Sequence, residues 1–187
     1  MIAIGDVCGK GAEAAALTAL TRYTVRAAAM YDRAPGGVLQ TLNEALLRGG
    51  EHDRFCTVVY ARLELGAEPP AVRVASGGHP LPVLLRPDGS VRELAASGAL
   101  LGVLPDASFA DERLALGRGD TLVFYTDGLT DAGAPARILR ERDVVEAVSQ
   151  CAGLDPAEIA ERLEAFALGG AAEPRDDIAL LVLRIRG

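Results

Sequence analysis

Three aspartates in this sequence stand beside short apolar runs that are typical of β-strands. Asp6 and Asp127 each follow such a run, and Asp176 comes just before one. Carboxylates are costly to bring together unless a cation compensates their charge, and Mg²⁺ and Mn²⁺ prefer oxygen ligands. The sequence therefore predicts that these three aspartates assemble one hard-metal site. The alternative is that each aspartate only forms a turn, as Asp commonly does after a strand.

The glycine-rich segment around Asp6 reads Gly-Asp-Val-Cys-Gly-Lys-Gly and is not a phosphate-binding loop. Its spacing does not fit GxxxxGK[ST], and no Ser or Thr follows Lys10. Lys10 could attract a phosphate, but a single lysine in a chain of net charge −7 is more often a solvated charge. These features argue against nucleotide hydrolysis.

Histidine and cysteine chemistry has little support. The chain has only His52 and His79, and its three cysteines, Cys8, Cys56 and Cys151, show no CxxC spacing. This argues against a zinc site, a disulfide framework and a Ser-His-Asp or Cys-His arrangement. His79 is tempting as a general acid, but a structural histidine in a turn is the favoured interpretation. Cys8 is interpreted as a small packing residue rather than as a metal ligand.

The composition is typical of one globular domain. A chain of 187 residues can bury roughly 70% of the surface that its unfolded form exposes, and its 50% hydrophobic and 24% charged residues are close to the average. The net charge of −7 disfavours nucleic acid as a partner. No apolar run reaches the roughly 18 residues of a membrane span, and the start lacks the features of a secretory signal. We expect a single soluble, cytoplasmic domain over residues 1–187 that binds neither nucleic acid nor membrane.

Hydrophobic periodicity predicts two helices in the first quarter of the chain. Residues 12–31 have the pattern of an amphipathic helix, which is ended by the Pro-Gly-Gly at 35–37, and a second helix runs from there to Gly49-Gly50. These two helices should cover one face of a sheet. The predicted buried stripe of the first helix consists of Leu17, Leu20, Thr24, Ala27 and Tyr31.

The remainder predicts strands, then helices, then a last strand. Residues 55–94 have the punctuation of an antiparallel meander, and residues 120–127 and 178–185 predict two further strands. The valines between 144 and 148 suggest a helix, and the Asp-Pro-Ala-Glu at 155–158 begins another one. This order favours an α+β fold over alternating βαβ units.

Six segments, taken in order, resemble the metal-dependent protein phosphatases. They are GDVCGKG from residue 5, FCTVVYARLEL from 55, ASGGHPLPVLL from 75, LGVLP from 101, GRGDTLVFYTDGLTDA from 117 and DDIALLVLRI from 176. They are most similar to the bacterial branch related to sporulation stage II protein E and the stress-response sigma-regulator phosphatases. The resemblance implies a protein phosphatase 2C-like fold, an antiparallel β-sandwich of two sheets packed face to face with helices outside.

The resemblance also implies roles for the aspartates. The residue that matches Asp6 bridges two metals, and the next residue, here Val7, offers its carbonyl oxygen. Asp127 and Asp176 match ligands of the first metal. Catalysis in this family needs no side-chain nucleophile, because two Mn²⁺ or Mg²⁺ ions activate a water molecule for in-line attack on the phosphate.

Neighbouring positions are assigned less directly. Asp131 matches an acidic position linked to a weaker third metal, with a solvated loop acid as the alternative. Asp177 matches a position that is asparagine in many relatives, and successive strand residues face opposite ways, so Asp176 is preferred over Asp177 as the ligand. Ala179 stands where the family often has threonine, which removes one possible hydrogen bond.

The resemblance implies a serine/threonine protein phosphatase that acts on a small anti-anti-sigma regulatory protein. It also implies a sensory domain upstream in the full-length protein and allows a homodimer. The alternative is a non-catalytic interaction module that keeps the phosphatase fold. Family members carry about 40 to 50 further residues before this point, including a Gly-Gly-Asp strand that supplies a metal ligand. We therefore expect an N-terminally incomplete domain, whose second metal keeps only Asp6 and the Val7 carbonyl and binds weakly.

Overall fold

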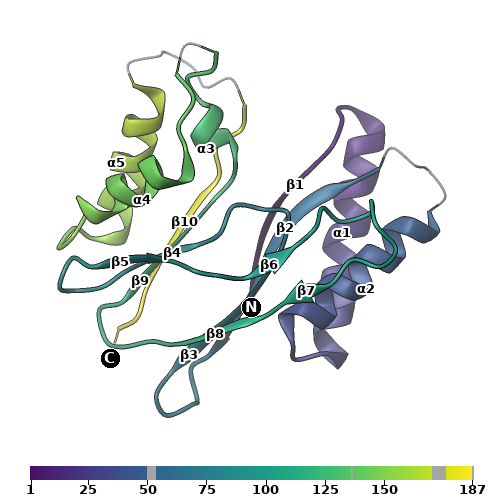
Figure 1. Cartoon of the computed structure of the whole chain (residues 1–187), viewed down its shortest axis with the longest axis horizontal. Coiled ribbons are helices and arrows are strands. Elements are labelled where there is room, and N and C mark those ends of the chain that lie inside the picture. Colours follow the sequence, from purple (N-terminus) through teal and green to yellow (C-terminus); the bar gives the residue numbers. More distant parts are fainter. Residues whose placement is uncertain (50–53, 136, 170–175, 187) are drawn as a thin grey trace. The chain divides into compact units, whose positions relative to one another are not determined.

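The elements form two units, each with its own antiparallel sheet and its own helices (Figure 1). The first unit comprises residues 1–79 and 95–115, and the second comprises residues 80–94 and 116–187. The relative position of the two units is not determined. This computed structural model describes residues 1–49, 54–135, 137–169 and 176–186. His52 and the predicted helix end at Gly50 lie outside the described residues.

The sheet of the first unit has the strand order β1-β2-β3-β8, and every neighbouring pair is antiparallel. Alternate residues of β2 contact the helices, as Cys56, Val58 and Tyr60 share one buried cluster with residues of α1 and α2. The two helices therefore pack on one face of this sheet, as the sequence predicts. The elements are β1 (Ile2–Val7), α1 (Ala12–Tyr31), α2 (Pro35–Arg48), β2 (Cys56–Glu64), β3 (Ala71–Gly77) and β8 (Glu112–Ala115), with a small separate pair of β6 (Ser97–Gly98) and β7 (Phe109–Ala110).

Helix α1 has the predicted bounds, but its predicted buried stripe is wrong except for Leu17. Its buried residues are Leu17, Val25, Ala28 and Ala29, whereas Tyr31 is 89% exposed. The buried face is rotated relative to the predicted one, so that Val25, Ala28 and Ala29 pack in the same cluster as residues of α2, while Leu20 and Tyr31 are exposed.

The Pro-Gly-Gly at 35–37 begins α2 and does not merely end α1. Helix α1 ends at Tyr31, and Asp32 follows in an extended conformation. Pro35 then occupies the first turn of α2, where its missing N–H costs no hydrogen bond and its fixed φ suits a helix.

The sheet of the second unit has the strand order β10-β9-β4-β5. Strands β9 and β10 pair in register from Leu180–Tyr125 to Arg184–Thr121, which confirms both strands predicted from the sequence. Helices α4 and α5 pack with these strands in one buried cluster that includes Val123, Val144 and Ile159. The elements are β4 (Val83–Leu85), β5 (Val91–Glu93), β9 (Thr121–Tyr125), α3 (Gly128–Asp131), α4 (Glu141–Ser149), α5 (Pro156–Leu168) and β10 (Leu180–Arg184).

The prediction of one meander over residues 55–94 is wrong. Strands β2 and β3 belong to the first sheet, and β4 and β5 belong to the second. Both edges of β3 are occupied, by β2 on one side and β8 on the other. The next strand along the chain therefore cannot pair with β3, and β4 pairs with β9 instead.

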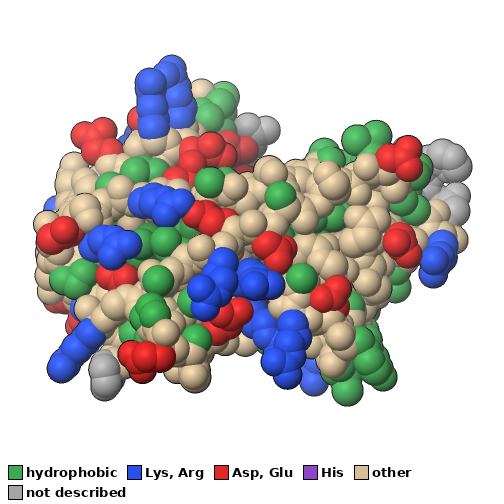
Figure 2. Space-filling model, turned by 60° about the horizontal axis from the view of Figure 1, so that its bottom comes forward, with side chains coloured by type: hydrophobic (Ala, Val, Ile, Leu, Met, Phe, Trp, Pro, Cys, Tyr) green, Lys and Arg blue, Asp and Glu red, His purple; other side chains and the backbone are tan. Residues whose placement is uncertain are grey.

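Charged side chains of both signs are interspersed over the face displayed in Figure 2. Ion pairs also join opposite charges of the described residues, such as Arg113 Nε and Glu64 Oε2 at 2.9 Å. Within the part of the chain that the structure describes, none of the helices has the length and apolar character needed to cross a membrane.

The start of α5 generates a first prediction. Asp155 Oδ1 accepts hydrogen bonds from the N–H groups of Ala157 (2.9 Å) and Glu158 (3.0 Å), and Glu158 Oε2 accepts from the N–H of Asp155 at 2.8 Å. Replacing Asp155 with Ala leaves these helix donors unsatisfied and should lower the free energy of unfolding by about 1 kcal/mol. Urea unfolding measures this change. Asp155→Asn, which keeps a capping oxygen, should stay close to wild type, and an equal loss in both variants would contradict the assignment.

Candidate metal centre

Asp6 lies near the end of β1, directly opposite Thr57 of β2. Its neighbours Gly5 and Val7 lie opposite Val58 and Cys56, and Val7 packs against the buried cluster of α1 and α2. Side chains alternate along a strand, and residues directly opposite each other share a face. Asp6 and Thr57 therefore point to the face of the sheet that α1 and α2 do not cover.

The turn after Asp6 depends on glycine. The N–H of Cys8 still bonds to the Phe55 carbonyl at 3.1 Å, after which Gly9 and Gly11 have φ angles of 93° and 78°. Such positive φ angles suit glycine and are strained for other residues. Gly11 is also the residue from which α1 begins. The glycine-rich segment after Asp6 is thus a turn hinged at its glycines, and Lys10 is exposed within it.

Asp6 and Asp176 are held by the same local device. Oδ1 of Asp6 accepts a hydrogen bond from the N–H of Val7 at 2.8 Å, and Oδ1 of Asp176 accepts one from Asp177 at 2.8 Å. Both carboxylates are exposed, and among the described residues neither has a basic partner. One oxygen of each carboxylate is therefore fixed by the backbone, and the other is available to a ligand from solution.

Thr126 joins the two segments that carry Asp127 and Asp176. Its N–H donates to the Ala179 carbonyl (3.1 Å), and its Oγ1 accepts from the Ala179 N–H (3.0 Å) and donates to the Asp177 carbonyl (3.3 Å). We call these three hydrogen bonds the Thr126 bridge. The bridge extends the pairing of β9 with β10 beyond both strands and holds the exposed Asp127 beside the segment that precedes β10.

Gly128 brings the start of α3 against this same segment. A Cβ atom at position 128 would overlap the carbonyl oxygen of Asp177. Glycine is required here because the two backbones approach too closely for any side chain. Neither Thr126 nor Gly128 was singled out from the sequence, although both lie next to Asp127 in the motif Tyr-Thr-Asp-Gly.

The two secondary candidates lie in this unit as well. Asp131 belongs to α3, and its N–H bonds to the Asp127 carbonyl at 2.9 Å. Residues four apart share one side of a helix, so Asp131 stays a candidate for a further metal. Asp177 precedes β10, which begins at Leu180, so the argument from alternating strand faces does not apply to it. Its observed contribution is its carbonyl, which accepts the Thr126 hydroxyl.

The aspartates suit a hard divalent cation by their chemistry. Asp127 and Asp176 come from one unit and Asp6 from the other, so the convergence of all three stays a prediction. Over residues 1–49, 54–135, 137–169 and 176–186, no three His, Cys, Asp or Glu side chains are grouped around one metal position. The candidate donors are exposed carboxylates and a backbone carbonyl, which match the oxygen preference of Mg²⁺ and Mn²⁺ and not that of soft metals.

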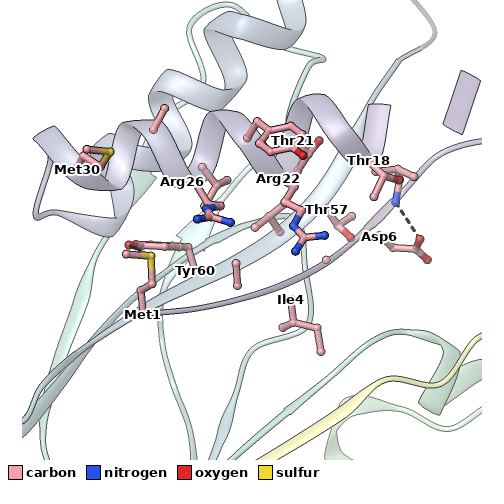
Figure 3. A pocket seen from close by; sticks show the side chains of 17 residues that line it. Met1, Ile4, Asp6, Thr18, Thr21, Arg22, Arg26, Met30, Thr57 and Tyr60 are labelled. Atoms are coloured by element: carbon pink, nitrogen blue, oxygen red, sulfur yellow. Dashed lines mark hydrogen bonds between the residues drawn. The ribbon is translucent and has the colours of Figure 1, made fainter. Parts of the chain in front are cut away.

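A groove of about 1220 Å³ passes Asp6 and is lined by residues of α1, β1 and β2, with residues from both faces of β1 among them (Figure 3). Asp6 and Thr57 lie toward one end of it, Met1 and Tyr60 toward the other, and the Arg22 side chain projects into it between them. Among the described residues that line this groove, Asp6 is the only acid.

The cysteines have the properties of packing residues. Burial raises the pKa of the Cys56 thiol to about 11, although a hydrogen bond from Thr21 opposes the shift. Burial also raises the pKa of Cys151. Cys8 packs against the cluster of α1 and α2, and its Sγ accepts from the Phe55 N–H at 3.4 Å. The two buried thiols stay protonated at neutral pH, so they are poor nucleophiles and poor metal ligands.

Comparison with known proteins identifies the family. Residues 1–186 match the family described as Stage II sporulation protein E (SpoIIE), and the chain belongs to this family. It is 27% identical over 191 residues to phosphoserine phosphatase RsbU of Bacillus subtilis, covering 98% of this chain and 55% of RsbU. The chain thus spans about half the length of this curated relative.

Solved structures show the same fold. The RsbU and RsbW domains of Rv1364c from Mycobacterium tuberculosis match with a TM-score of 0.79 and 25% identity, over 98% of this chain and 51% of that one. The PP2C phosphatase domain of SpoIIE from Bacillus subtilis, in a structure that includes a fragment of its regulatory domain, matches with a TM-score of 0.78 and 20% identity, over 98% and 53%. The fold is therefore the α+β, protein phosphatase 2C-like fold that the sequence predicts.

The close approach at Gly128 yields a second prediction. Gly128→Ala should push the start of α3 away from Asp177, lower the free energy of unfolding by about 1–3 kcal/mol and weaken Mn²⁺ binding. Gly66→Ala is a matched control, because a Cβ there meets no atom within 4 Å. Urea unfolding and isothermal titration with Mn²⁺ measure both effects. Equal behaviour of the two variants would show that the approach at Gly128 is not required.

Proposed function

We propose that the two units together form one metal-dependent serine/threonine protein phosphatase domain. The observation that carries this proposal is the SpoIIE family match over residues 1–186, combined with exposed carboxylates at the three matching positions. The chain's similarity to RsbU, which is named a phosphoserine phosphatase, supports the same reaction class.

Asp6, the Val7 carbonyl, Asp127 and Asp176 are the proposed ligands, with Asp131 for a further cation. When bound, two Mn²⁺ or Mg²⁺ ions would neutralise phosphate charge and lower the pKa of a water molecule that attacks phosphorus. A fold relative, RsbX, has a crystal structure in complex with magnesium, with a TM-score of 0.65 and 17% identity to this chain. The choice of divalent oxygen-binding metals agrees with the carboxylate donors of this chain.

The chain's own contribution is to hold these oxygens in place before any ligand arrives. The Val7 N–H fixes the Asp6 carboxylate, the Asp177 N–H fixes that of Asp176, and the Thr126 bridge keeps the segments of Asp127 and Asp176 in contact. Fixed donors lose little conformational entropy on binding. No Ser, Cys or His side chain of the described residues is assigned as a nucleophile.

The substrate is proposed to be phosphoserine or phosphothreonine on a small regulatory protein of the anti-anti-sigma type. This follows the similarity to RsbU and to the SpoIIE phosphatase domain. The same proposal includes a sensory domain elsewhere in the full-length protein, because a regulatory phosphatase must respond to a signal. It also includes a cytoplasmic homodimer.

Substitution of the proposed ligands tests the function. Asp6→Asn, Asp127→Asn and Asp176→Asn should each lower Mn²⁺-dependent hydrolysis of an aryl phosphate and of a phosphoserine peptide by roughly a hundredfold or more. Glu161→Gln on the exposed side of α5 is the control and should behave as wild type. Excess chelator should abolish hydrolysis in wild type and control alike.

Hydrolysis that persists in excess chelator would contradict the proposal. Mn²⁺ binding that depends on the three aspartates, without any hydrolysis of either substrate, would favour the non-catalytic interaction module instead.

Thiol chemistry gives an independent check. Iodoacetamide at neutral pH should modify Cys8, which is partly exposed, and leave Cys56 and Cys151 unmodified, because burial disfavours their thiolates. Intact-mass analysis counts the modified thiols, and the rate of hydrolysis should not change. A phosphocysteine intermediate, or loss of activity in step with alkylation, would show that a thiol takes part.

A further inference from the structure

A buried histidine contacts Thr57, the residue of β2 that lies directly opposite Asp6. His79 is 4% exposed, and its Nδ1 lies 2.9 Å from Oγ1 of Thr57. Thr57 in turn lies directly across the β1–β2 pair from Asp6. The metal-ligand assignment gives no role to either side chain, although both are adjacent to a proposed ligand.

The turn that carries His79 is closed by other atoms. Ser76, which is also 4% exposed, donates from its Oγ to the His79 carbonyl at 2.7 Å and accepts from the His79 N–H at 3.0 Å. These two bonds fix the backbone after β3 without the imidazole. The imidazole bonds to Thr57 on β2, so it acts on a strand and not only on its own turn.

We propose that His79 and Thr57 are a positioning pair for the carboxylate of Asp6. The imidazole selects one orientation of the Thr57 side chain, whose χ1 is already restricted by branching at Cβ. Directly opposite residues of an antiparallel pair have Cβ atoms about 4.5–5.5 Å apart. A fixed Thr57 therefore limits the directions open to Asp6 Oδ2, while the Val7 N–H holds Oδ1.

This inference rests on the proposed function, since it requires Asp6 to be a metal ligand. Groups that orient a ligand commonly change metal affinity by about 10–100-fold when they are removed. A purely structural role for the pair would instead change stability and leave the affinity of the folded protein intact. The two possibilities are therefore separated by measuring binding and stability on the same variants.

The test titrates Mn²⁺ into the 187-residue chain by calorimetry and follows unfolding in urea. Thr57→Val, which keeps the shape and removes the hydroxyl, should weaken Mn²⁺ binding by about 10–100-fold. Thr57→Ser, which keeps the hydroxyl, should restore wild-type affinity. Ser76→Ala is the matched control from the same turn: it should lower stability and leave the Mn²⁺ affinity unchanged.

Wild-type affinity in a folded Thr57→Val variant would overturn the proposal, as would an equal loss of affinity in Ser76→Ala. If Thr57→Val does not fold, His79→Asn, whose amide can replace Nδ1, should bind Mn²⁺ as wild type does, and His79→Leu should bind more weakly. Equal affinities of these two variants would also overturn it. Asp6→Asn separates the two proposals: if wild type and Asp6→Asn bind Mn²⁺ equally, Asp6 is not a ligand and both proposals fail, whereas weak binding by Asp6→Asn with wild-type affinity in Thr57→Val overturns this inference alone.

Discussion

The uncompensated charge of exposed carboxylates is the constraint that shapes the end of β1 and the segment before β10. Two like charges 4 Å apart repel by about 1 kcal/mol in water and by several kcal/mol near a protein surface of lower dielectric. The chain leaves Asp6 and Asp176 exposed and without basic partners among the described residues. It holds each of them by a backbone N–H, which orients a carboxylate without neutralising it. Both acids suit a cation, because none of the described residues pairs with them to compensate their charge.

The parts of the fold that provide stability are kept apart from these acids. Each unit has its own buried cluster, in which helices pack against one sheet, and the acids lie at exposed strand ends outside both clusters. Polar contacts lie between each buried cluster and the acids of its unit. They are the Thr126 bridge in one unit and the Thr57–His79 pair in the other. In each unit, a few hydrogen bonds rather than apolar packing thus link the buried cluster to the proposed ligands.

The sequence sufficed for the elements whose signals are local. The glycine turn after Asp6, the capped start of α5 and the strands around Asp127 and Asp176 follow from adjacent residues, and so does the order that favours an α+β fold. Which strands pair with each other, and which helix face is buried, could not be predicted in the same way. The sequence between β3 and β4 looks like the turn of a hairpin. A hairpin is excluded only because β3 already pairs with β2 on one edge and with β8 on the other. The buried face of α1 was mispredicted because it includes Ala28 and Ala29 and leaves Leu20 and Tyr31 exposed, which the spacing of large side chains does not indicate.

The same limit explains why the supporting residues of the site were missed. Nothing in Thr126 as a residue type indicates that its hydroxyl bonds both to Asp177 and to Ala179, since the second strand is about fifty residues away. This arrangement also bears on Ala179, a position at which the sequence resemblance implies threonine. The Thr126 hydroxyl donates to the Asp177 carbonyl and accepts from the Ala179 N–H. The backbone of residue 179 therefore bonds to Thr126 whatever its side chain is. The missing hydroxyl therefore removes no contact on which the pairing of these two segments depends, and the alanine is compatible with an intact site.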